Sequence, residues 1–444
     1  MVNLISHISK YLIILLMALY AYLDIRFLSV KSEDKKKSLL MRLNLSMFLI
    51  HLLAYMVLWL KTEDESILAF YVLQAGFFLG YLFLYPFLYP RASGLLVSNS
   101  CMLLAVGFIM LKRLELSKTS GQMMAERQFL IAVIGAVITL LVPFAIERLW
   151  QLASYPWVYA VVGIILLGAV LIGGQSSYGA RISLTLGNFS FQPAEFVKIT
   201  FVFFAASLFY RSVSRKTIGA ATAAAAVHIF ILVGSRDLGS ALIFALTYLL
   251  MLFVATGKWL YLAAGTLFAG GASVAAFRLF SHVRTRVIAW LDPWSDIDNR
   301  GYQITQSLFA IGTGGWFGMG LYEGMPERIP VVEKDFIFSA VSEELGGITA
   351  VCLLLVCFGI FLQFILLAGR MKAMFYKLLA FGFGVVYIIQ VFLNVGGVTK
   401  FIPSTGVTLP FVSYGGSSVI STFIVMGIIQ GLYIIKSREE EVKG

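Results

Sequence analysis

The sequence predicts an all-α polytopic integral membrane protein with about 13 transmembrane helices. Hydrophobic residues make up 59% of its 444 residues and charged residues only 13%, whereas an average globular chain is about half apolar and about one quarter charged. Apolar runs of roughly 17 to 25 residues, each long enough to cross a hydrocarbon core of about 30 Å, recur along nearly the whole chain. The alternating strands of about ten residues that mark a membrane barrel are absent, so helices must satisfy the backbone in lipid.

The predicted spans follow one another with short charged links. They lie at about 8–28, 41–60, 66–88, 95–112, 129–147, 155–173, 194–211, 217–234, 238–256, 259–279, 336–368, 375–394 and 413–435. The first span has a weakly basic start, but no small-x-small cleavage pattern follows before Asp24 and Arg26. We therefore expect a retained helix rather than a signal peptide.

Several later elements carry local signals of their own. Pro193, followed by apolar residues, predicts a helix start, and Asp237 is favoured as the cap of the helix that follows it. The segment 336–368 is too long for one straight crossing, so we expect it to begin or end outside the membrane core. Two prolines, three glycines and several hydroxyls in 400–418 predict broken backbone at the entrance to the last helix.

The net charge of +11 is assigned to lipid headgroups and topology rather than to nucleic acid. The lysines and arginines of 26–42 place that loop in the cytoplasm, and the acidic link 61–65 suits the outside. Most later loops agree with this alternation. Four basic residues disagree, namely Lys112, Arg113, Lys118 and Arg127. The majority predicts an external N-terminus and a cytoplasmic C-terminus.

Three polar intervals then share the outer side: 174–193, 280–335 and 395–412. Seven aromatic residues between Trp290 and Tyr322 can pack or sit at the membrane interface, so we expect a structured loop in 280–335. Its glycine-rich run AIGTGGWFGMG permits tight turns or close approach to a ligand. The three cysteines lie in apolar segments and the four histidines are scattered, so no metal cluster is predicted.

The same loop carries the densest group of chemically active side chains. The stretch LDPWSDIDNRGYQITQS contains Asp292, Asp296 and Asp298, which are candidate bases or cation ligands. Three arginines that could bind an anion lie close by: Arg284, Arg286 and Arg300. A carboxylate beside an arginine is also common as a solvated loop pair or a helix cap, and composition alone leaves these alternatives open.

Two further groups of charges lie within or beside apolar helices. Glu195 and Lys198 are three residues apart and so share one helical face, either as a local ion pair or as a functional pair. Glu343 and Glu344 interrupt an apolar helix, and we expect one of them to face the bundle interior or a polar cavity.

Five segments together identify a family resemblance. They are GARISLTLGNFSFQPAEFVKI, DLGSAL, LDPWSDIDNRGYQITQSLFAIGTGGWFGMGL, DFIFSAVSEELGG and PSTGVTLPFVSYGGSS. In this order and approximate spacing they resemble the SEDS family (shape, elongation, division and sporulation), the RodA, FtsW and SpoVE type of membrane protein. The resemblance runs from about residue 95 to the C-terminus. This sequence departs from the pattern at Arg236, where the family usually has proline.

The resemblance implies a ten-helix core in 93–444 with the large extracellular loop 280–335, and leaves 1–92 as extra N-terminal membrane helices. It implies a peptidoglycan glycosyltransferase that polymerises lipid II into glycan strands at the outer face of the bacterial cytoplasmic membrane, with inversion at the sugar carbon, for elongation, division or sporulation. The implied partners are lipid II, the nascent glycan, membrane lipids and a class B penicillin-binding protein that supplies transpeptidase activity.

The resemblance places the family's essential aspartate at Asp296, our candidate general base for the acceptor hydroxyl. A cationic group or a divalent cation, Mg²⁺ or Mn²⁺, must stabilise the departing diphosphate. The residues predicted to bind substrate are Arg181, Glu195, Lys198, Gln306, Lys400 and Ser413. No residue is assigned as a metal ligand.

Two alternative functions remain open from the sequence. A lipid II flippase would also have many helices, internal charges and glycine-broken segments, but it needs a polar pathway to both leaflets. The polar segments here gather on the outer side. A scaffold without activity is the second alternative, and it predicts that Asp296→Asn leaves polymer synthesis unchanged.

Overall fold

The computed structural model describes residues 2–117, 123–148, 150–177, 180–186 and 189–441. These residues contain 13 helices long and apolar enough to cross a membrane, which confirms the predicted polytopic all-α class. They are α1 (Val2–Ser29), α2 (Glu33–Thr62), α3 (Glu65–Leu88), α4 (Gly94–Ser117), α5 (Met124–Arg148), α6 (Pro156–Gly173), α7 (Pro193–Arg211), α8 (Arg215–Gly234), α9 (Leu238–Thr256), α10 (Trp259–Leu279), α13 (Ile337–Arg370), α14 (Met374–Val398) and α15 (Gly416–Glu441).

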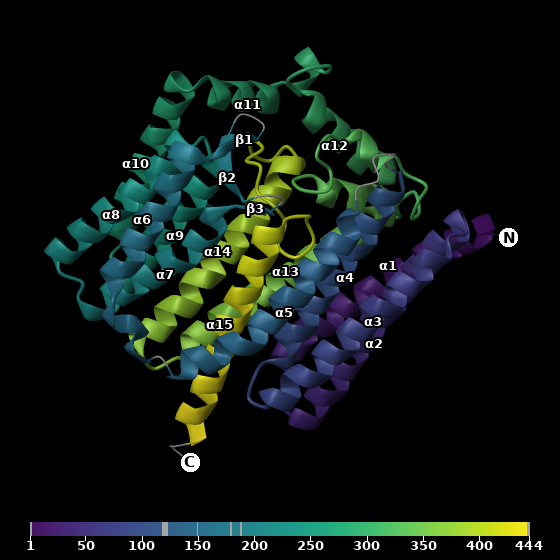
Figure 1. Ribbon diagram of the computed structural model, residues 1–444, viewed down its shortest axis with the longest axis horizontal. Helices are drawn as coiled ribbons and strands as arrows, with labels where there is room; N and C mark the ends of the chain where they lie inside the picture. The colour runs from purple at the N-terminus through teal and green to yellow at the C-terminus, as the bar shows by residue number, and fades with distance from the viewer. Residues whose placement is uncertain (1, 118–122, 149, 178–179, 187–188, 442–444) are drawn as a thin grey trace.

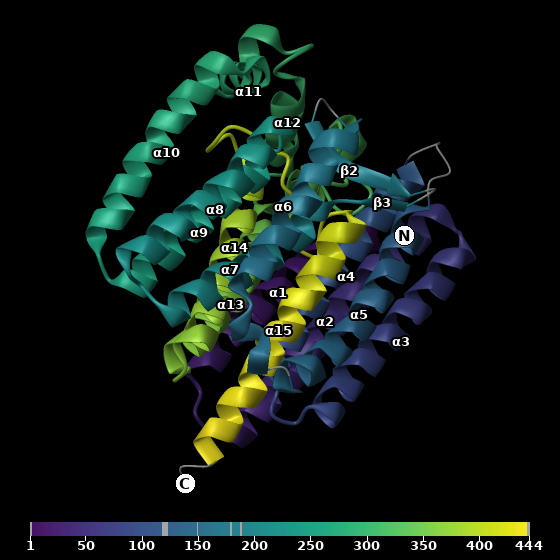
Figure 2. The ribbon, with the colours of Figure 1, turned by 60° about the vertical axis from the view of Figure 1, so that its left-hand side comes forward.

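The helices form one bundle whose centre is α4, α7, α13, α14 and α15 (Figure 1). Most residues of these helices are buried, because each packs against several others. In contrast α10 buries none of its residues and stands at the edge of the bundle (Figure 2). Its apolar surface is therefore left for lipid.

The interval 174–193 forms a small antiparallel sheet that the sequence analysis did not predict. Its strands are β1 (Gln175–Ser177), β2 (Ala180–Leu186) and β3 (Phe189–Phe191), in the order β1-β2-β3. Ile182 and Leu184 alternate with the polar residues beside them, and such alternation is the pattern of a half-buried strand. The polar composition of the interval concealed this short periodicity.

The interval 280–335 is structured, as predicted. It contains α11 (Ser281–Leu291), the 3₁₀ turn η2 (Pro293–Asp296), α12 (Tyr302–Gly314) and a second 3₁₀ turn, η3 (Pro326–Arg328). These elements lie with the small sheet at one end of the bundle, and the C-terminus lies at the other (Figure 1). The polar end of the molecule is thus built from segments far apart in the sequence.

Helix α13 is broken at Gly346, where φ is +88°, and the glycine-rich segment 314–320 packs into the break. The backbone N–H groups of Met319 and Gly320 donate to the carbonyls of Glu343 and Glu344 at 2.8 and 3.0 Å. In return the N–H of Gly347 donates to the Gly315 carbonyl at 2.8 Å. The loop thus supplies the hydrogen bonds that the broken helix lacks.

Close backbone contact explains why this interlocked region is rich in glycine. A Cβ atom at Gly346 would lie 2.6 Å from the Trp316 carbonyl oxygen, and one at Gly318 would collide with the Glu344 carbonyl. Gly318 also has a φ of +72°, which disfavours other residues. The glycines of this run therefore allow close approach to another helix.

An ion pair between Arg113 and Glu344 fastens α4 to the same break. The Arg113 Nε donates to the Glu344 carboxylate at 2.6 Å, and both side chains are shielded from solvent. The Arg113 guanidinium also donates to the Gly324 carbonyl at 2.9 Å and lies over the Tyr322 ring. As expected, one glutamate of the pair 343–344 faces the bundle interior.

Two of the four basic residues that disagree with the predicted orientation, Lys112 and Arg113, are explained by such pairing. Lys112 pairs with Glu115 at 2.8 Å and with Glu126 at 2.7 Å. Lys112 and Arg113 are therefore neutralised inside the protein and do not act as topology signals. Lys118 lies outside the described residues.

The N-terminal helices pack against α4 and α13 and reach the glycine-rich segment. Near the start of α1, the Lys10 ammonium donates to the Gly318 carbonyl at 3.1 Å. Deeper in the bundle, the Asn99 amide donates to the buried Asp24 carboxylate at 2.8 Å. The start of α1 thus lies at the end of the bundle that carries α11 and α12.

We predict that Gly318→Ala destabilises the fold by about 2 kcal/mol or more, because an alanine at positive φ is strained and its methyl group meets the Glu344 carbonyl. Thermal unfolding of the detergent-solubilised protein measures the effect as a lower Tm. Gly312→Ala on α12 is the matched control, since nothing lies within 4 Å of its added methyl group. Equal Tm values for the two variants would contradict the interlock.

Candidate active site

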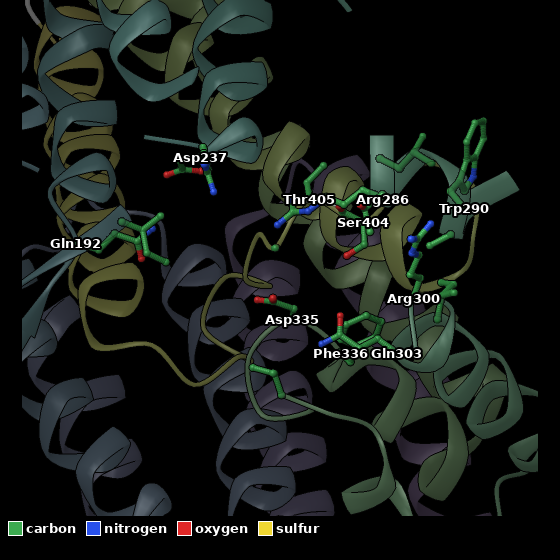
Figure 3. A pocket seen from close by; sticks show the side chains of 18 residues that line it. Gln192, Asp237, Arg286, Trp290, Arg300, Gln303, Asp335, Phe336, Ser404 and Thr405 are labelled. Atoms are coloured by element: carbon green, nitrogen blue, oxygen red, sulfur yellow. Dashed lines mark hydrogen bonds between the residues drawn. The ribbon is translucent and has the colours of Figure 1, made fainter. Parts of the chain in front are cut away.

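A polar pocket of about 250 Å³ opens where α11, α12, the small sheet and the segment before α15 meet (Figure 3). Its lining residues come from seven separate stretches of the chain. They are Ile182, Gln192, Arg236, Asp237, Thr285, Arg286, Ala289, Trp290, Arg300, Gln303, Ile304, Val331, Asp335, Phe336, Ile402, Ser404, Thr405 and Gly406. This volume is below the range of about 300 to 1,000 Å³ that is typical of small-molecule sites, so the pocket has room for only part of a large ligand.

Helix α11 is fixed to the segment before α15 by two hydrogen bonds. The Trp290 indole N–H donates to the Lys400 carbonyl at 3.0 Å, and the Arg286 Nη1 donates to the Ser404 carbonyl at 3.3 Å. Both donors also line the pocket. The same contacts therefore close the fold and orient a guanidinium towards the cavity.

Two carboxylates line the pocket. Asp237 caps α9, as predicted, because its Oδ1 accepts from the Ser240 N–H at 3.1 Å. Its Oδ2 is shielded and has no hydrogen-bond partner, and burial raises the pKa of Asp237. Burial also raises the pKa of Asp335 to about 6, although Lys334 and Arg286 oppose the shift. Both carboxyls are thus more basic than a solvated aspartate.

The predicted catalytic residue Asp296 is not part of the pocket lining but lies beside the lining residue Arg300. Its carboxylate is 38% exposed, accepts from the Asn299 amide at 2.9 Å and lies 3.8 Å from the Arg300 Nε. Arg300 itself lines the pocket. The turn that carries Asp296 requires Gly301, since a Cβ there would collide with the Pro293 carbonyl.

Glu195 and Lys198 form a buried ion pair on α7, with 2.9 Å between the Lys198 Nζ and a Glu195 oxygen. Lys198 also donates to the Gln390 side chain at 2.8 Å, and the Ser421 hydroxyl donates to Glu195 at 2.9 Å. These four residues line a second, much smaller cavity of about 20 Å³. The pair joins α7 to α14 and α15.

The other predicted binding residues lie beside the pocket lining. The side chain of Arg181 on β2 donates to the Leu171 carbonyl at 3.1 Å, next to the lining residue Ile182. Gln306 follows the lining residue Gln303 by one helical turn. The Lys400 carbonyl accepts the hydrogen bond from the Trp290 indole N–H.

Ser413 completes the predicted set. Its hydroxyl donates to the Lys334 carbonyl, and it accepts from the Leu409 N–H at 2.8 Å. It therefore holds the segment that carries Asp335 without reaching the cavity.

Sequence reasoning did not select Asp335, Thr405 or Gln303. Asp335 stands within the quoted motif DFIF, which gave a signal, but nothing in one sequence shows which polar motif residue faces a cavity. The sequence marks Arg236 only as a departure from the family pattern, but it predicts Arg286 and Arg300, with Arg284, as arginines that could bind an anion; Arg284 does not line the pocket. The pocket gives the other three arginines a common place.

The described residues contain no group of three or more His, Cys, Asp or Glu side chains arranged to hold a metal ion. The pocket instead offers three guanidinium groups and two carboxylates. This set of donors fits an anionic ligand with hydroxyl groups better than a metal held by the protein alone.

A protein-family model described as "Cell cycle protein" (FtsW, RodA and SpoVE) matches residues 94–438. Among curated relatives, the peptidoglycan glycosyltransferase RodA of Mycobacterium bovis is 36% identical over 366 residues, which cover 77% of each chain.

Two solved structures share the fold. One, described as "Structural coordination of polymerization and crosslinking by a peptidoglycan synthase complex", has a TM-score of 0.64, 27% identity and coverage of 78% of this chain and 98% of that one. The other is the rod shape determining protein RodA of Thermus thermophilus, with a TM-score of 0.58, 25% identity and coverage of 77% and 96%.

We predict that Lys198→Met destabilises the protein by about 3 to 5 kcal/mol, because Glu195 is left as an uncompensated buried charge. The double variant Glu195→Gln/Lys198→Met should recover part of the lost Tm. Lys216→Met removes an exposed lysine at the start of α8 and serves as the control. A double variant less stable than Lys198→Met would contradict the ion-pair assignment.

Proposed function

This chain belongs to the FtsW/RodA/SpoVE family, and on that premise we propose that it is a peptidoglycan glycosyltransferase that polymerises lipid II. The observation that carries the proposal is the pocket in which arginines and aspartates from distant segments converge. Polymerisation requires a site that binds a diphosphate and, beside it, a carboxylate that can receive a proton. The pocket supplies both kinds of group.

Arg286 and Arg300 are our candidates to bind the diphosphate of the donor. Guanidinium groups bind phosphate oxygens through paired hydrogen bonds, and Arg286 is already oriented by the Ser404 carbonyl. Arg236 lines the same cavity. These groups stabilise the negative charge that grows on the leaving diphosphate.

The sequence-predicted residues then act around this pocket. Arg181, Gln306 and Lys400 extend the binding surface beyond its wall, while Glu195, Lys198 and Ser413 support the helices and segments behind it. Asp296, which lies beside Arg300, is required for transfer. To act as general base it must reach the acceptor hydroxyl, which requires its turn to move inward from the position that it has here.

A divalent cation remains a proposal. Mg²⁺ or Mn²⁺, held by one or two protein carboxylates, would supply positive charge that offsets the charge of the substrate diphosphate. Polymerisation measured with a chelator, and again after each cation is restored, tests this requirement.

We further propose that the pocket faces the outside of the bacterial cytoplasmic membrane. The N-terminus is then external and the C-terminus cytoplasmic, in agreement with the basic loop 26–42. This placement brings a lipid-anchored donor and a growing glycan to the same surface.

The proposed partner is a class B penicillin-binding protein. Support comes from the solved complex in which polymerization and crosslinking are coordinated, to which residues of this chain are similar over 78% of its length. Residues 93–444 form the proposed catalytic core and residues 1–92 an added membrane unit. Co-purification of the full chain with a single-span transpeptidase tests the partnership.

We predict that Asp296→Asn lowers lipid II polymerisation by about 100-fold or more, as expected for removal of an essential carboxylate. The assay follows glycan chains made by the purified protein in liposomes, with and without the partner. Asp298→Asn is the matched control, since Asp298 lies two residues away and is exposed.

A wild type that makes no glycan under any condition yet moves labelled lipid II across the bilayer would replace the polymerase with a flippase. An Asp296→Asn variant as active as wild type would instead favour a scaffold or another catalytic group.

A further inference from the structure

The pocket points to a different proton acceptor from the one that the loop motif suggests. We propose that Asp335 is the catalytic base that takes the proton from the attacking sugar hydroxyl, and that Asp296 acts through Arg300 as a positioning residue. This inference rests on the proposed glycosyl transfer and assigns one step within it.

Asp335 occupies the middle of the pocket. In Figure 3 it lies between Asp237 and Gln192 on one side and Arg300 and Gln303 on the other. The acceptor hydroxyl that attacks a sugar diphosphate must lie where the acceptor meets the donor. A carboxylate between the two ends of the pocket is therefore placed to receive its proton.

The backbone that carries Asp335 is held from three sides. The Tyr414 N–H donates to the Glu333 carbonyl at 2.7 Å, and the Ser413 hydroxyl donates to the Lys334 carbonyl. The Asn394 amide donates to the Asp335 carbonyl at 2.9 Å and to the Val407 carbonyl at 2.7 Å. Three consecutive residues are thus anchored to α14 and the segment before α15, which fixes the carboxylate in place.

Gly406 keeps open the space in front of this carboxylate. A Cβ atom built at Gly406 would lie 3.5 Å from the Asp335 Oδ2 and 4.0 Å from the Arg286 Nη2. Both charged groups therefore border the same small volume. A ligand atom in that volume would contact the base and a guanidinium together.

The charge state of Asp335 suits the task. Burial raises its pKa to about 6 and Glu333 adds to the shift, whereas Lys334 and Arg286 oppose it. The carboxyl is then mostly ionised at neutral pH, yet it is basic enough to hold a proton in the transition state. The other charged groups that line the pocket are Arg236, Asp237 and Arg300.

His282 lies one turn before Arg286. It does not contribute to the pH dependence at pH values above the ordinary pKa of a histidine. Burial, Arg236 and Arg286 all lower the pKa of His282, so the ring is neutral at neutral pH.

Asp296 differs from Asp335 in its position relative to the pocket. It lies on a turn outside the pocket lining, and its carboxylate forms an ion pair with Arg300 at 3.8 Å. Through that contact it orients a guanidinium that lines the cavity. Loss of Asp296 would then weaken the stabilisation of the diphosphate.

The step balances without a further reactant. The acceptor O–H bond breaks as its proton passes to the Asp335 carboxylate, and the oxygen forms a bond to the anomeric carbon of the donor sugar. The bond from that carbon to the diphosphate oxygen breaks, and its electron pair leaves with the diphosphate beside Arg286 and Arg300. Asp335 afterwards releases the proton to water.

The test is kcat for lipid II polymerisation between pH 5 and 8.5, measured with the full-length protein in liposomes. We expect the wild-type rate to fall as pH drops through about 6, because Asp335 becomes protonated. Asp335→Asn should lose about 100-fold or more in kcat, and Asp335→Glu should keep part of the activity. The residual activity of Asp296→Asn should keep the same acidic limb.

Three results would overturn the inference. One is an Asp335→Asn variant within threefold of wild type. Another is an acidic limb that disappears in Asp296→Asn but persists in the residual activity of Asp335→Asn, since Asp296 would then be the titrating base. The third is a wild-type rate independent of pH between 5 and 7. The profile of Asp296→Asn decides the matter even where Asp335→Asn fails to fold.

Failure of the proposed function looks different. A wild type that makes no glycan at any pH removes the glycosyltransferase proposal itself, and the inference with it. An active wild type whose profile follows Asp296 removes only the assignment of the base.

Discussion

The interlock between the glycine-rich segment 314–320 and the break in α13 supports the rest of the polar end. At Gly346 the regular hydrogen bonds of the helix are interrupted. The loop replaces them through the N–H groups of Met319 and Gly320 and through the carbonyl of Gly315, which accepts from Gly347 of the helix. Arg113 closes the arrangement from α4 by pairing with Glu344 at 2.6 Å. Because a buried unpaired backbone group is costly, the loop and the helix must be placed together. Helix α12, which ends at Gly314, is thereby fixed against the bundle.

Fixing α12 gives the pocket one stable wall, and α11 gives it another. Trp290 and Arg286 attach α11 to the segment before α15, and Asn394 attaches that segment to α14. The pocket therefore depends on backbone carbonyls of irregular segments as much as on helices. Such segments are tolerated in a membrane protein where they are buried in protein or line a cavity. The backbone carbonyls of Lys400, Ser404 and Val407 accept hydrogen bonds from Trp290, Arg286 and Asn394 here.

The N-terminal helices are joined to the same end of the molecule. Lys10 donates to the Gly318 carbonyl, and Lys61 pairs with Glu323. Asp24, deeper in the bundle, reaches Asn99 of α4. The added unit thus contacts both the core helices and the loop that packs into α13. These contacts place it beside the interlock and away from the pocket lining.

The sequence by itself determined the membrane class, the number and approximate position of the spans, the start of α7 at Pro193, the cap at Asp237 and the family, because hydropathy, capping and motif order are local properties of a chain. It placed Asp296 and Arg300 in one loop for the same reason. Only the tertiary structure decided that Arg113 meets Glu344, 231 residues away, and that Asp335 faces Arg286 across Gly406. The short strands of 174–193 also escaped the sequence analysis, since their alternation is brief and set within polar residues. Contacts between distant segments depend on how all the helices pack, and no local pattern encodes which buried charges will share a cavity.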